Sequence, residues 1–419
     1  MKEPIITVGI MSARSIGVEL CGLYRLVAVG SDGRRVQRER MTGRQQLEAQ
    51  DDGTIRCAAV PGGWHHLCFQ PMEEAEDAFF ELQSVTIGVR FHWQRQENQR
   101  FRGSLELIRE GDLLTAVNAI AAEEYLTSVI SSEMSATAPL ELLKAHAVIS
   151  RSWLLHCLSA KEQPAAAPPP PPAAADEYVR WYERDAHTHF DVCADDHCQR
   201  YQGITRASTP QAREAVVATR GQVLTWQGEV CDARVSKCCG GRSERFGTCW
   251  ADREVPYLQP VDDPFCAQAN AALLARAMNG YDCETVGFYR WQVGYSRQQL
   301  SELVRQRSGT DLGDILRLTP LACGASGRIY RLRIEGSLRN LTVGKELEIR
   351  RILSPSHLYS SAFTVARRAD GGFRLQGKGW GHGVGLCQIG AAVMADRGYR
   401  YDEILHYYYK DIEIEKRYE

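Results

Sequence analysis

The pattern of apolar and polar positions predicts a β-rich beginning of the chain. Near residue 85, five apolar residues alternate with polar residues or glycine: Val85, Ile87, Val89, Phe91 and Trp93. This two-residue period is typical of a half-buried strand. A second strand is expected at 101–108, and Glu110–Gly111–Asp112 predicts a hairpin turn that continues into 113–120. The first 110 residues are therefore expected to form a β-rich scaffold.

Helical periodicity begins near Glu123, where residues 125, 126, 129 and 130 share one face. A second helix is expected from Pro139 to about Leu158, since the missing N–H of proline costs little in the first turn. Glu133 lies at the end of the first helix, and we expect it to point into a cleft at the helix junction. Further strands are expected at 222–232 and 329–334, and further helices at 297–307 and 401–409.

The segment PAAAPPPPPAAA at 164–175 is of low complexity and is expected to be an extended polyproline II excursion. We interpret 164–176 as a loop insertion that acts as a semi-rigid spacer. A binding site for a proline-recognising partner is the alternative.

Composition indicates a globular chain of 419 residues, with 44% hydrophobic and 24% charged residues. A formal net charge of -2 argues against a nucleic-acid partner held by bulk electrostatics. The N-terminus lacks the residue order of a signal peptide, and no apolar run approaches the length of a membrane span. Fourteen cysteines without such a signal fit reduced thiols or metal ligands at least as well as disulfides.

Glu133 is the candidate acid. A carboxyl group that acts as a general acid near neutral pH must stay protonated, which requires weakly solvated surroundings. Val129, Ile130 and Met134 offer such surroundings. The alternative is a structural carboxylate that caps the second helix or pairs with Lys144.

Two cysteines and three histidines lie within residues 187–199: His187, His189, Cys193, His197 and Cys198. They offer more than enough ligands for a tetrahedral zinc site. The Cys-x4-Cys spacing is looser than a zinc knuckle, so a turn with one buried cysteine and surface histidines is the alternative.

A second cysteine-rich zone contains Cys231, Cys238, Cys239, Cys249, Cys266 and Cys283. Its spacings match no zinc pattern, and disulfide connectivity cannot be read from sequence. Buried thiols are therefore expected here, with a second metal or a disulfide as the less favoured alternatives. A nucleophilic Cys239 is not supported, because no histidine base is marked for it.

Residues 377–392 (GKGWGHGVGLCQIGAA) contain six glycines, which permit positive backbone dihedral angles and a close approach of amide groups to a ligand. Such a segment suits a hydroxyl-rich sugar chain. A phosphate-binding loop is disfavoured because its lysine and hydroxyl are missing. A tight strand-to-helix connection is the structural alternative.

Together with 124–153 (EYLTSVISSEMSATAPLELLKAHAVISRSW), this glycine-rich segment resembles the family of stage II sporulation protein D, also called the amidase enhancer or LytB family, whose members cut or bind cell-wall glycan. The resemblance implies an α+β fold, with a β-rich module at 1–110 and a mixed α/β catalytic core at 111–419 that forms a glycan-binding cleft. The chain departs from the family pattern at the proline insertion, at His146, where glutamine is more frequent, and at Cys387, where serine is common.

The resemblance implies a lytic transglycosylase that cleaves peptidoglycan between N-acetylmuramic acid and N-acetylglucosamine, with Glu133 as its single general acid/base and 1,6-anhydro ends as products. It assigns the following residues to glycan binding or support of the site: Lys144, Arg151, Trp380, His382 and Gln388. A non-catalytic peptidoglycan-binding protein that stimulates an N-acetylmuramoyl-L-alanine amidase is the alternative, and a zinc-dependent hydrolase is a third hypothesis.

Some members of the family bind zinc through one histidine and two cysteines, which implies His187, Cys193 and Cys198 here, with His189 as the next candidate. Three ligands would leave one position for water or substrate, although we expect the metal mainly to shape the cleft wall. The family also implies a cell-envelope or periplasmic location. Because no signal peptide is visible, a cytoplasmic location stays open.

Overall fold

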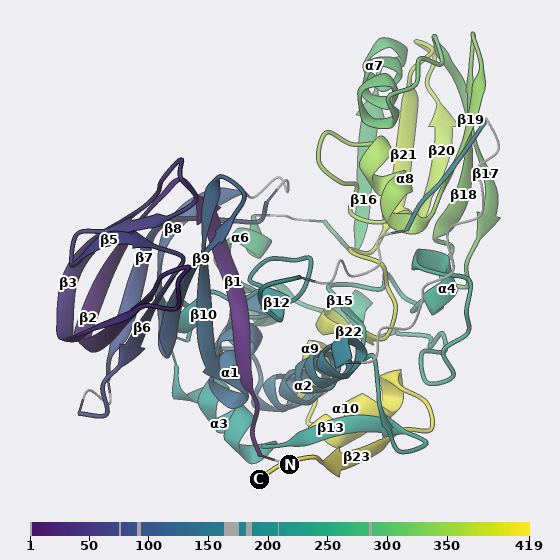
Figure 1. Cartoon of the computed structure of the whole chain (residues 1–419). Helices are drawn as coiled ribbons and strands as arrows, with labels where there is room; N and C mark the ends of the chain where they lie inside the picture. Colours follow the sequence, from purple (N-terminus) through teal and green to yellow (C-terminus); the bar gives the residue numbers. More distant parts are fainter. Residues whose placement is uncertain are drawn as a thin grey trace. The chain divides into compact units, whose positions relative to one another are not determined.

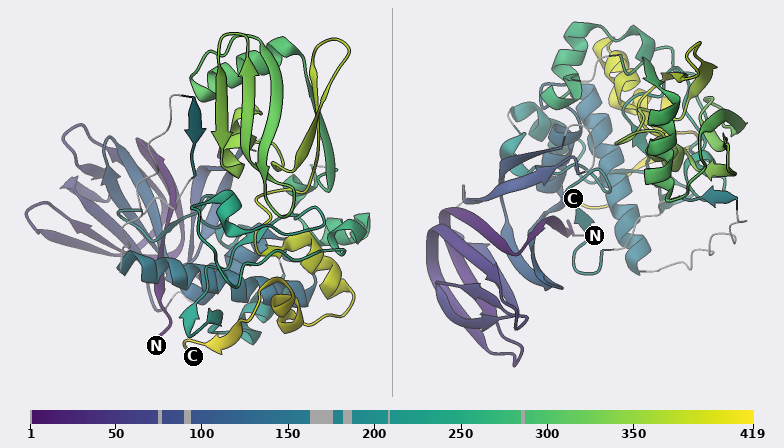
Figure 2. Two further views of the ribbon diagram at one scale, coloured as in Figure 1. Left: turned by 90° about the vertical axis from the view of Figure 1, so that its right-hand side faces the viewer. Right: turned by 90° about the horizontal axis from the view of Figure 1, so that it is seen from above.

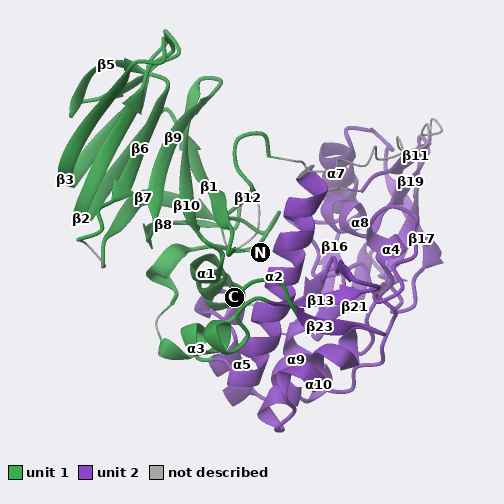
Figure 3. Ribbon diagram, turned by 60° about the horizontal axis from the view of Figure 1, so that its bottom comes forward, with its two compact units in different colours: residues 1–137, 186–221, 416–419 green, residues 138–185, 222–415 purple. Residues whose placement is uncertain are grey.

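The computed structural model describes residues 2–74, 77–89, 94–162, 176–181, 187–207, 209–284 and 287–419. The chain forms two compact units (Figure 3): unit 1 contains residues 1–137, 186–221 and 416–419, and unit 2 contains 138–185 and 222–415. Helices and strands mix along the chain (Figure 1), which confirms the predicted α+β class.

The predicted insertion at 164–176 lies outside the described residues except for its last position. No helix in the described part of the chain is long and apolar enough to cross a membrane.

Unit 1 is built on a large, mainly antiparallel sheet. Its described strands follow the order β12–β1–β10–β9–β6–β2–β3–β4–β5, and β7 pairs with both β2 and β8. The strands are β1 (Ile5–Ala13), β2 (Ser15–Val29), β3 (Arg35–Ala49), β4 (Ile55–Cys57), β5 (Val60–Trp64), β6 (His66–Pro71), β7 (Phe79–Ile87), β8 (Arg95–Phe101), β9 (Ser104–Glu110), β10 (Leu113–Ala121) and β12 (Val192–Cys193). The prediction of a β-rich beginning is confirmed.

The alternation that predicted a strand near residue 85 lies in β7, where Val85 and Ile87 are buried. Phe91 and Trp93 lie outside the described residues. The predicted hairpin is β9–β10, which turns at Gly111 with a φ of 58°. The compact units do not follow the predicted division after residue 110, because β10 pairs with β9 on one side and with β1 on the other.

Helix α1 (Ala122–Glu133) continues directly from β10 and ends at Glu133, as predicted. Four apolar side chains predicted to share one face are buried: Tyr125, Leu126, Val129 and Ile130. The helix contacts α3 (Pro210–Ala218) and the short 3-10 helix η1 (Gly203–Thr205). Unit 1 thus contains both the candidate acid and the segment with the predicted zinc ligands.

Unit 2 is organised around α2 (Leu140–Glu162), which begins after Pro139 as predicted and contacts α9 (Gln388–Asp396) and α10 (Tyr401–Tyr408). It also contacts the hairpin of β13 (Gln222–Trp226) and β14 (Glu229–Val230). The prediction of one strand over 222–232 is wrong, because Gln227 and Gly228 adopt positive φ angles of 51° and 83° and turn the chain.

A second apolar core of unit 2 lies between strands and helices of residues 290–378. Helix α7 (Arg297–Ser308), predicted at 297–307, contacts β16 and β17, and Figure 2 shows this region from two further directions. The described strands of unit 2 not yet given are β11 (Glu177–Val179), β15 (Val235–Ser236), β16 (Arg290–Tyr295), β17 (Ile315–Cys323), β18 (Ile329–Gly336), β19 (Asn340–Gly344), β20 (Phe363–Arg367), β21 (Phe373–Lys378), β22 (Leu386–Cys387) and β23 (Glu413–Lys416). The remaining described helices are α4 (Phe246–Cys249), η2 (Cys266–Gln268), α5 (Ala271–Ala277), α6 (Gly280–Cys283) and α8 (Glu346–Ile352).

The close approach of η1 to β8 predicts that Gly203→Ala destabilises unit 1. A Cβ at Gly203 would lie 1.9 Å from the Arg100 carbonyl oxygen, and a side chain at a φ of 58° is strained as well. We expect a loss of about 2 kcal/mol or more in the free energy of unfolding, measured by urea denaturation.

Gly111→Ala is the matched control, because Gly111 has the same φ of 58° and a Cβ there meets nothing within 4 Å. It isolates the conformational cost, which we expect to be about 1 kcal/mol. Equal losses in the two variants would contradict the predicted clash with Arg100.

Candidate active site

Glu133 is the last residue of α1, and its position is fixed by the termination of that helix. Met134 adopts an extended conformation with a φ of -125°, and its side chain is buried beside the half-buried Glu133. The hydroxyls of Ser131 and Ser132 donate to the carbonyls of Thr127 and Ser128 one turn earlier. The last turn is therefore tied to its own backbone, and the glutamate is its final residue.

A loop from residue 198 to residue 202 lies against this helix end. The backbone N–H of Arg200 donates to Oε1 of Glu133 at 3.0 Å. The N–H of Gln202 donates to Oγ of Ser132 at 3.2 Å. The buried Tyr125 hydroxyl donates to Oε1 of Gln199 at 3.1 Å, so three contacts join the loop to α1 and fix the position of the carboxyl group.

The predicted zinc ligands are anchored on β1 by the parallel pairing of β12 (Gly9 with Cys193). Asp191 accepts hydrogen bonds from the backbone N–H and the hydroxyl of Thr7, at 3.0 and 2.8 Å. The ring of Phe190 covers Gly9, where a Cβ would come within 2.5 Å of it, and stacks on His187 at 4.5 Å. This anchoring sets the positions of His187 and Cys193.

Four ligand atoms meet in this segment, from His187, Cys193, His197 and Cys198, all within 4.8 Å of one another. The distance from Nε2 of His187 to Sγ of Cys198 is 3.4 Å, and those from Nδ1 of His197 to the two sulfurs are 3.5 and 3.9 Å. Around a tetrahedral Zn²⁺ the corresponding nitrogen–sulfur separation is about 3.6 Å. The donor set and its spacing therefore fit zinc.

The structure brings together His187, Cys193 and Cys198 as predicted, but the fourth donor is His197 and not His189. A metal held by all four of these donors would have no position left for water or substrate, in contrast to the open three-ligand site expected from the sequence. Zinc binding itself stays a prediction. The pKa of the Cys193 thiol is lowered, because the Cys198 thiol and the two imidazoles hydrogen-bond to its sulfur.

The Cys/His cluster connects directly to the candidate acid. The guanidinium of Arg200, nearly buried, pairs with Asp196 at 2.6 Å, within the turn that carries His197 and Cys198. The backbone N–H of the same arginine binds Glu133. A metal bound in this cluster would therefore stabilise the loop that orients the carboxyl group.

Lys144 and Arg151 lie on α2 in unit 2, where both have partners within that unit. Lys144 pairs with Glu141 at 2.7 Å, and Glu141 also accepts the N–H of Tyr401. Arg151 is fully buried and donates to the carbonyl oxygen of Gln222 at 2.9 Å. This burial argues against direct glycan contact by Arg151 and favours a role in holding β13 against α2.

The glycine-rich segment forms a tight connection between β21 and α9. A Cβ at Gly383 would come within 2.5 Å of the buried Arg328 guanidinium, and one at Gly385 within 1.9 Å of the Arg234 carbonyl oxygen. Arg328 donates to the carbonyls of Gly381 and Cys239 at 2.9 and 3.1 Å. The glycines therefore let this loop pack against its own unit, as the structural alternative predicted.

Trp380 and His382 are partly exposed on this loop. Trp380 is near the rings of Phe288 and Tyr359, with centroids 5.8 and 6.0 Å away. Nδ1 of His382 accepts the N–H of Val384, so Nε2 carries the proton of the neutral ring. Burial, followed by the charges of Arg234 and Arg328, lowers the pKa of His382 well below its usual value. Contact of either residue with a sugar stays a prediction.

Gln388 is buried at the start of α9, and its amide lies 2.9 Å from Nε2 of His146. Nδ1 of His146 contacts the Ser150 hydroxyl at 3.1 Å. Burial and the charge of Lys237 lower the pKa of His146 to about 3, so the ring is neutral at physiological pH. The prediction that Gln388 contacts a sugar is not supported, because its side chain is buried and its amide contacts His146 inside unit 2.

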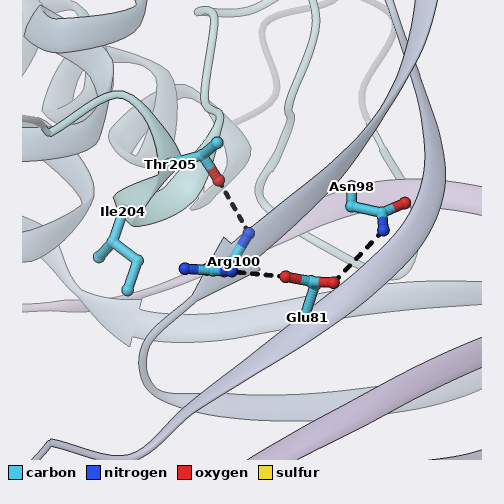
Figure 4. Close-up of a pocket in the computed structure, with 5 residues that line it drawn as sticks. All are labelled: Glu81, Asn98, Arg100, Ile204 and Thr205. Carbon is cyan, nitrogen blue, oxygen red and sulfur yellow. Dashed lines mark hydrogen bonds and ion pairs between the residues drawn. The ribbon is translucent and has the colours of Figure 1, made fainter.

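A hollow of about 420 Å³ lies on unit 1, where Arg100 binds Glu81 and Thr205 (Figure 4). A second, of about 530 Å³, lies on unit 2 beside α4, near Asp252 and Tyr330. None of the predicted site residues lines either hollow. The candidate site therefore depends on the position of Glu133 and its loop.

Two residues of this site were missed by sequence reasoning. His197 was one of three histidines in the predicted segment, and its place directly before Cys198 is the signal that was available. Arg200 acts through its backbone amide, which no side-chain pattern reveals. The structure brings Glu133 together with the Cys/His cluster in unit 1, whereas Lys144, Arg151, Trp380, His382 and Gln388 belong to unit 2.

Two family models match the chain. Stage II sporulation protein matches residues 110–226, which include α1, α2 and the Cys/His cluster. Domain of unknown function (DUF8618) matches residues 244–385 and so includes the first part of the glycine-rich segment. The first match covers the candidate acid and the loop that binds it.

Among similar proteins, an uncharacterized protein of Brachyspira hyodysenteriae is 28% identical over 75% of this chain and 72% of its own length. Stage II sporulation protein D of Bacillus amyloliquefaciens is 26% identical over 71% of this chain and 75% of its own length. The amidase enhancer of Bacillus subtilis is 22% identical, over 47% of this chain and 31% of its own length. Residues 110–226 thus match the stage II sporulation protein family, and the chain is similar to stage II sporulation protein D and to the amidase enhancer.

Proposed function

We propose that this protein acts on the bacterial cell wall as a peptidoglycan lytic transglycosylase. Its substrate would be glycan strands stripped of stem peptides, cleaved between N-acetylmuramic acid and N-acetylglucosamine. The family supports a role related to the cell wall. The observation that carries the specific reaction is the half-buried carboxyl group of Glu133, held at a helix end by the N–H of Arg200.

A single carboxyl group is sufficient for this reaction. Protonated Glu133 donates its proton to the glycosidic oxygen as the bond from that oxygen to C1 of the muramic residue breaks. The resulting carboxylate then accepts the proton of the C6 hydroxyl, whose oxygen forms a bond to C1. The product is a 1,6-anhydro end and the acid is regenerated, so the second carboxylate of ordinary glycosidases is not required.

We propose that His187, Cys193, His197 and Cys198 hold one Zn²⁺ ion in a closed structural site. When bound, the ion supplies charge neutralisation and cross-linking for the two thiolates and two imidazoles. The ion would also hold the carboxyl group of Glu133 in place, because Arg200 pairs with Asp196 of the same turn and donates its backbone N–H to Glu133. A zinc-dependent hydrolase is disfavoured, because four protein donors leave no position for an activated water.

A second candidate function is a peptidoglycan-binding accessory protein that stimulates an N-acetylmuramoyl-L-alanine amidase and cuts nothing itself. The similarity to the amidase enhancer of Bacillus subtilis favours it, although the match covers 31% of that protein. Either function places the protein at the cell envelope or periplasm, with peptidoglycan strands as its partner. We propose this location on the family alone.

The transglycosylase hypothesis predicts that Glu133→Gln abolishes product formation. The amide keeps an oxygen that accepts the N–H of Arg200 but cannot deliver a proton, so we expect a rate loss of about 10²–10⁴-fold. The measurement is release of 1,6-anhydro ends from denuded glycan strands, followed by mass spectrometry.

Glu124→Gln is the control on the same helix, since Glu124 is partly exposed and its pair with Arg213 is a long surface contact of 4.0 Å. We expect normal activity from it. If the wild-type protein binds the strands and releases no product, the accessory function replaces the enzymatic one.

The four-donor site predicts that His197→Ala removes one equivalent of zinc per chain, as His187→Ala does. His189→Ala should keep the wild-type zinc content, because His189 is outside the cluster. Elemental analysis of the purified variants measures this. Zinc loss in His189→Ala together with retention in His197→Ala would contradict the assignment of the fourth ligand.

A further inference from the structure

A second cluster of metal-ligating side chains lies inside unit 2. It consists of Cys239, Asp263, Cys266 and Cys387, all buried, with their ligand atoms within 4.8 Å of one another. The four residues come from three segments: the loop after β15, the stretch that leads into η2, and the last residue of β22. Neither the proposed reaction nor the Cys/His cluster of unit 1 uses them.

The sulfur positions fit a metal better than a disulfide. Sγ of Cys239 and Sγ of Cys266 are 3.7 Å apart, and none of the three cysteines of this cluster forms a disulfide. Two thiolates on a tetrahedral Zn²⁺ are separated by about 3.8 Å, since the zinc–sulfur bond is about 2.3 Å. A disulfide requires about 2.05 Å. Oδ2 of Asp263 lies 3.2 Å from Sγ of Cys239, close enough to complete the same coordination sphere.

The surroundings orient these donors. Sγ of Cys387 is the N-cap of α9 and accepts the backbone N–H groups of Cys239 and Gly390, at 3.2 and 3.4 Å. Such donors and the positive end of a helix dipole stabilise a thiolate. Both N–H groups are therefore in place to hydrogen-bond to this sulfur when it binds a metal.

The carboxylate of Asp263 is equally fixed. Its Oδ1 accepts the N–H groups of Phe265 and Cys266, at 2.9 and 3.1 Å, and its Oδ2 accepts the Tyr408 hydroxyl at 3.0 Å. A Cβ at Gly390 would come within 2.3 Å of Oδ2, so only glycine lets α9 approach this carboxylate. Hydrogen bonds from neighbouring groups to a ligand side chain, such as these to Asp263, are typical of metal sites.

We propose that unit 2 contains a second structural metal site, in which Cys239, Asp263, Cys266 and Cys387 bind one Zn²⁺ ion. Three soft thiolates and one carboxylate in a buried cluster suit this metal. The site ties β22 and the start of α9 to the loop that forms backbone hydrogen bonds between Cys238 and Trp380. It thereby stabilises the glycine-rich segment that carries Trp380 and His382.

The zinc content of the full-length protein tests this proposal, with Cys266→Ser and Cys387→Ser as variants of the second site and His197→Ala as a variant of the first. We expect two equivalents of zinc in the wild type, one in each single variant and none in the Cys266→Ser/His197→Ala double variant. Cys231→Ser changes a buried cysteine of unit 2 outside the cluster and should keep both equivalents. Full zinc retention in Cys266→Ser and Cys387→Ser would overturn the proposal, as would iron and sulfide in place of zinc.

A second measurement on the wild-type protein avoids any folding defect of the variants. Iodoacetamide labelling before and after zinc chelation, with peptide mass spectrometry, reports the accessibility of each thiol. We expect Cys239, Cys266 and Cys387 to be protected with zinc bound and to be labelled after chelation, whereas Cys231 should change little. Equal labelling with and without the chelator, or a Cys239–Cys266 disulfide in the native protein, would refute the site. Neither experiment requires activity, so a failed transglycosylase assay leaves this test intact.

Discussion

The hydrogen bond from the backbone N–H of Arg200 to the carboxyl group of Glu133 is the contact on which the candidate site depends. It joins two parts of the chain 67 residues apart and does so through the backbone, whose position is set by everything that anchors the loop. Tyr125 and Ser132 on α1 hold Gln199 and Gln202 on either side of it. A carboxyl group at a helix end would otherwise sample many rotamers, and a proton donor must be held within a fraction of an ångström of its target.

The Cys/His cluster lies in a loop with little secondary structure. Its strand β12 pairs with β1 through two residues only, Val192 and Cys193. Side chains supply the remaining order: Asp191 binds Thr7, and Arg200 pairs with Asp196. Four side-chain atoms that could bind a metal converge in the same segment. A metal bound there would fix both ends of the loop at once, which is the usual contribution of a structural zinc site.

Two residues that the family resemblance assigned to the site, and the arginine that packs against the glycine-rich segment, have their partners in the interior of unit 2. Arg151, Arg328 and Gln388 are buried, and their polar groups meet backbone carbonyls or another side chain. A buried guanidinium is tolerated only when its donors are satisfied, so these residues restrict how their neighbours can pack. A motif that looks like a ligand-binding segment can therefore be required for the shape of the loop. In the glycine-rich segment, Gly383 and Gly385 leave no room for a Cβ because Arg328 and Arg234 occupy that space.

The sequence by itself determined those features that depend on local order. The period of apolar residues placed α1, α2 and the strand at Val85, since a helix or strand buries the same face at every turn or every second residue. The short spacing of Cys193 and Cys198 marked one metal-ligating segment, because residues so close along the chain cannot lie far apart. Only the tertiary structure decided that His197 and not His189 lies in that cluster, since both are histidines of one short segment and differ only in where the fold places them. It also decided the burial of Arg151 and Gln388 and the meeting of Cys239, Cys266 and Cys387, because residues 27 and 148 positions apart are brought together by packing that no local pattern encodes.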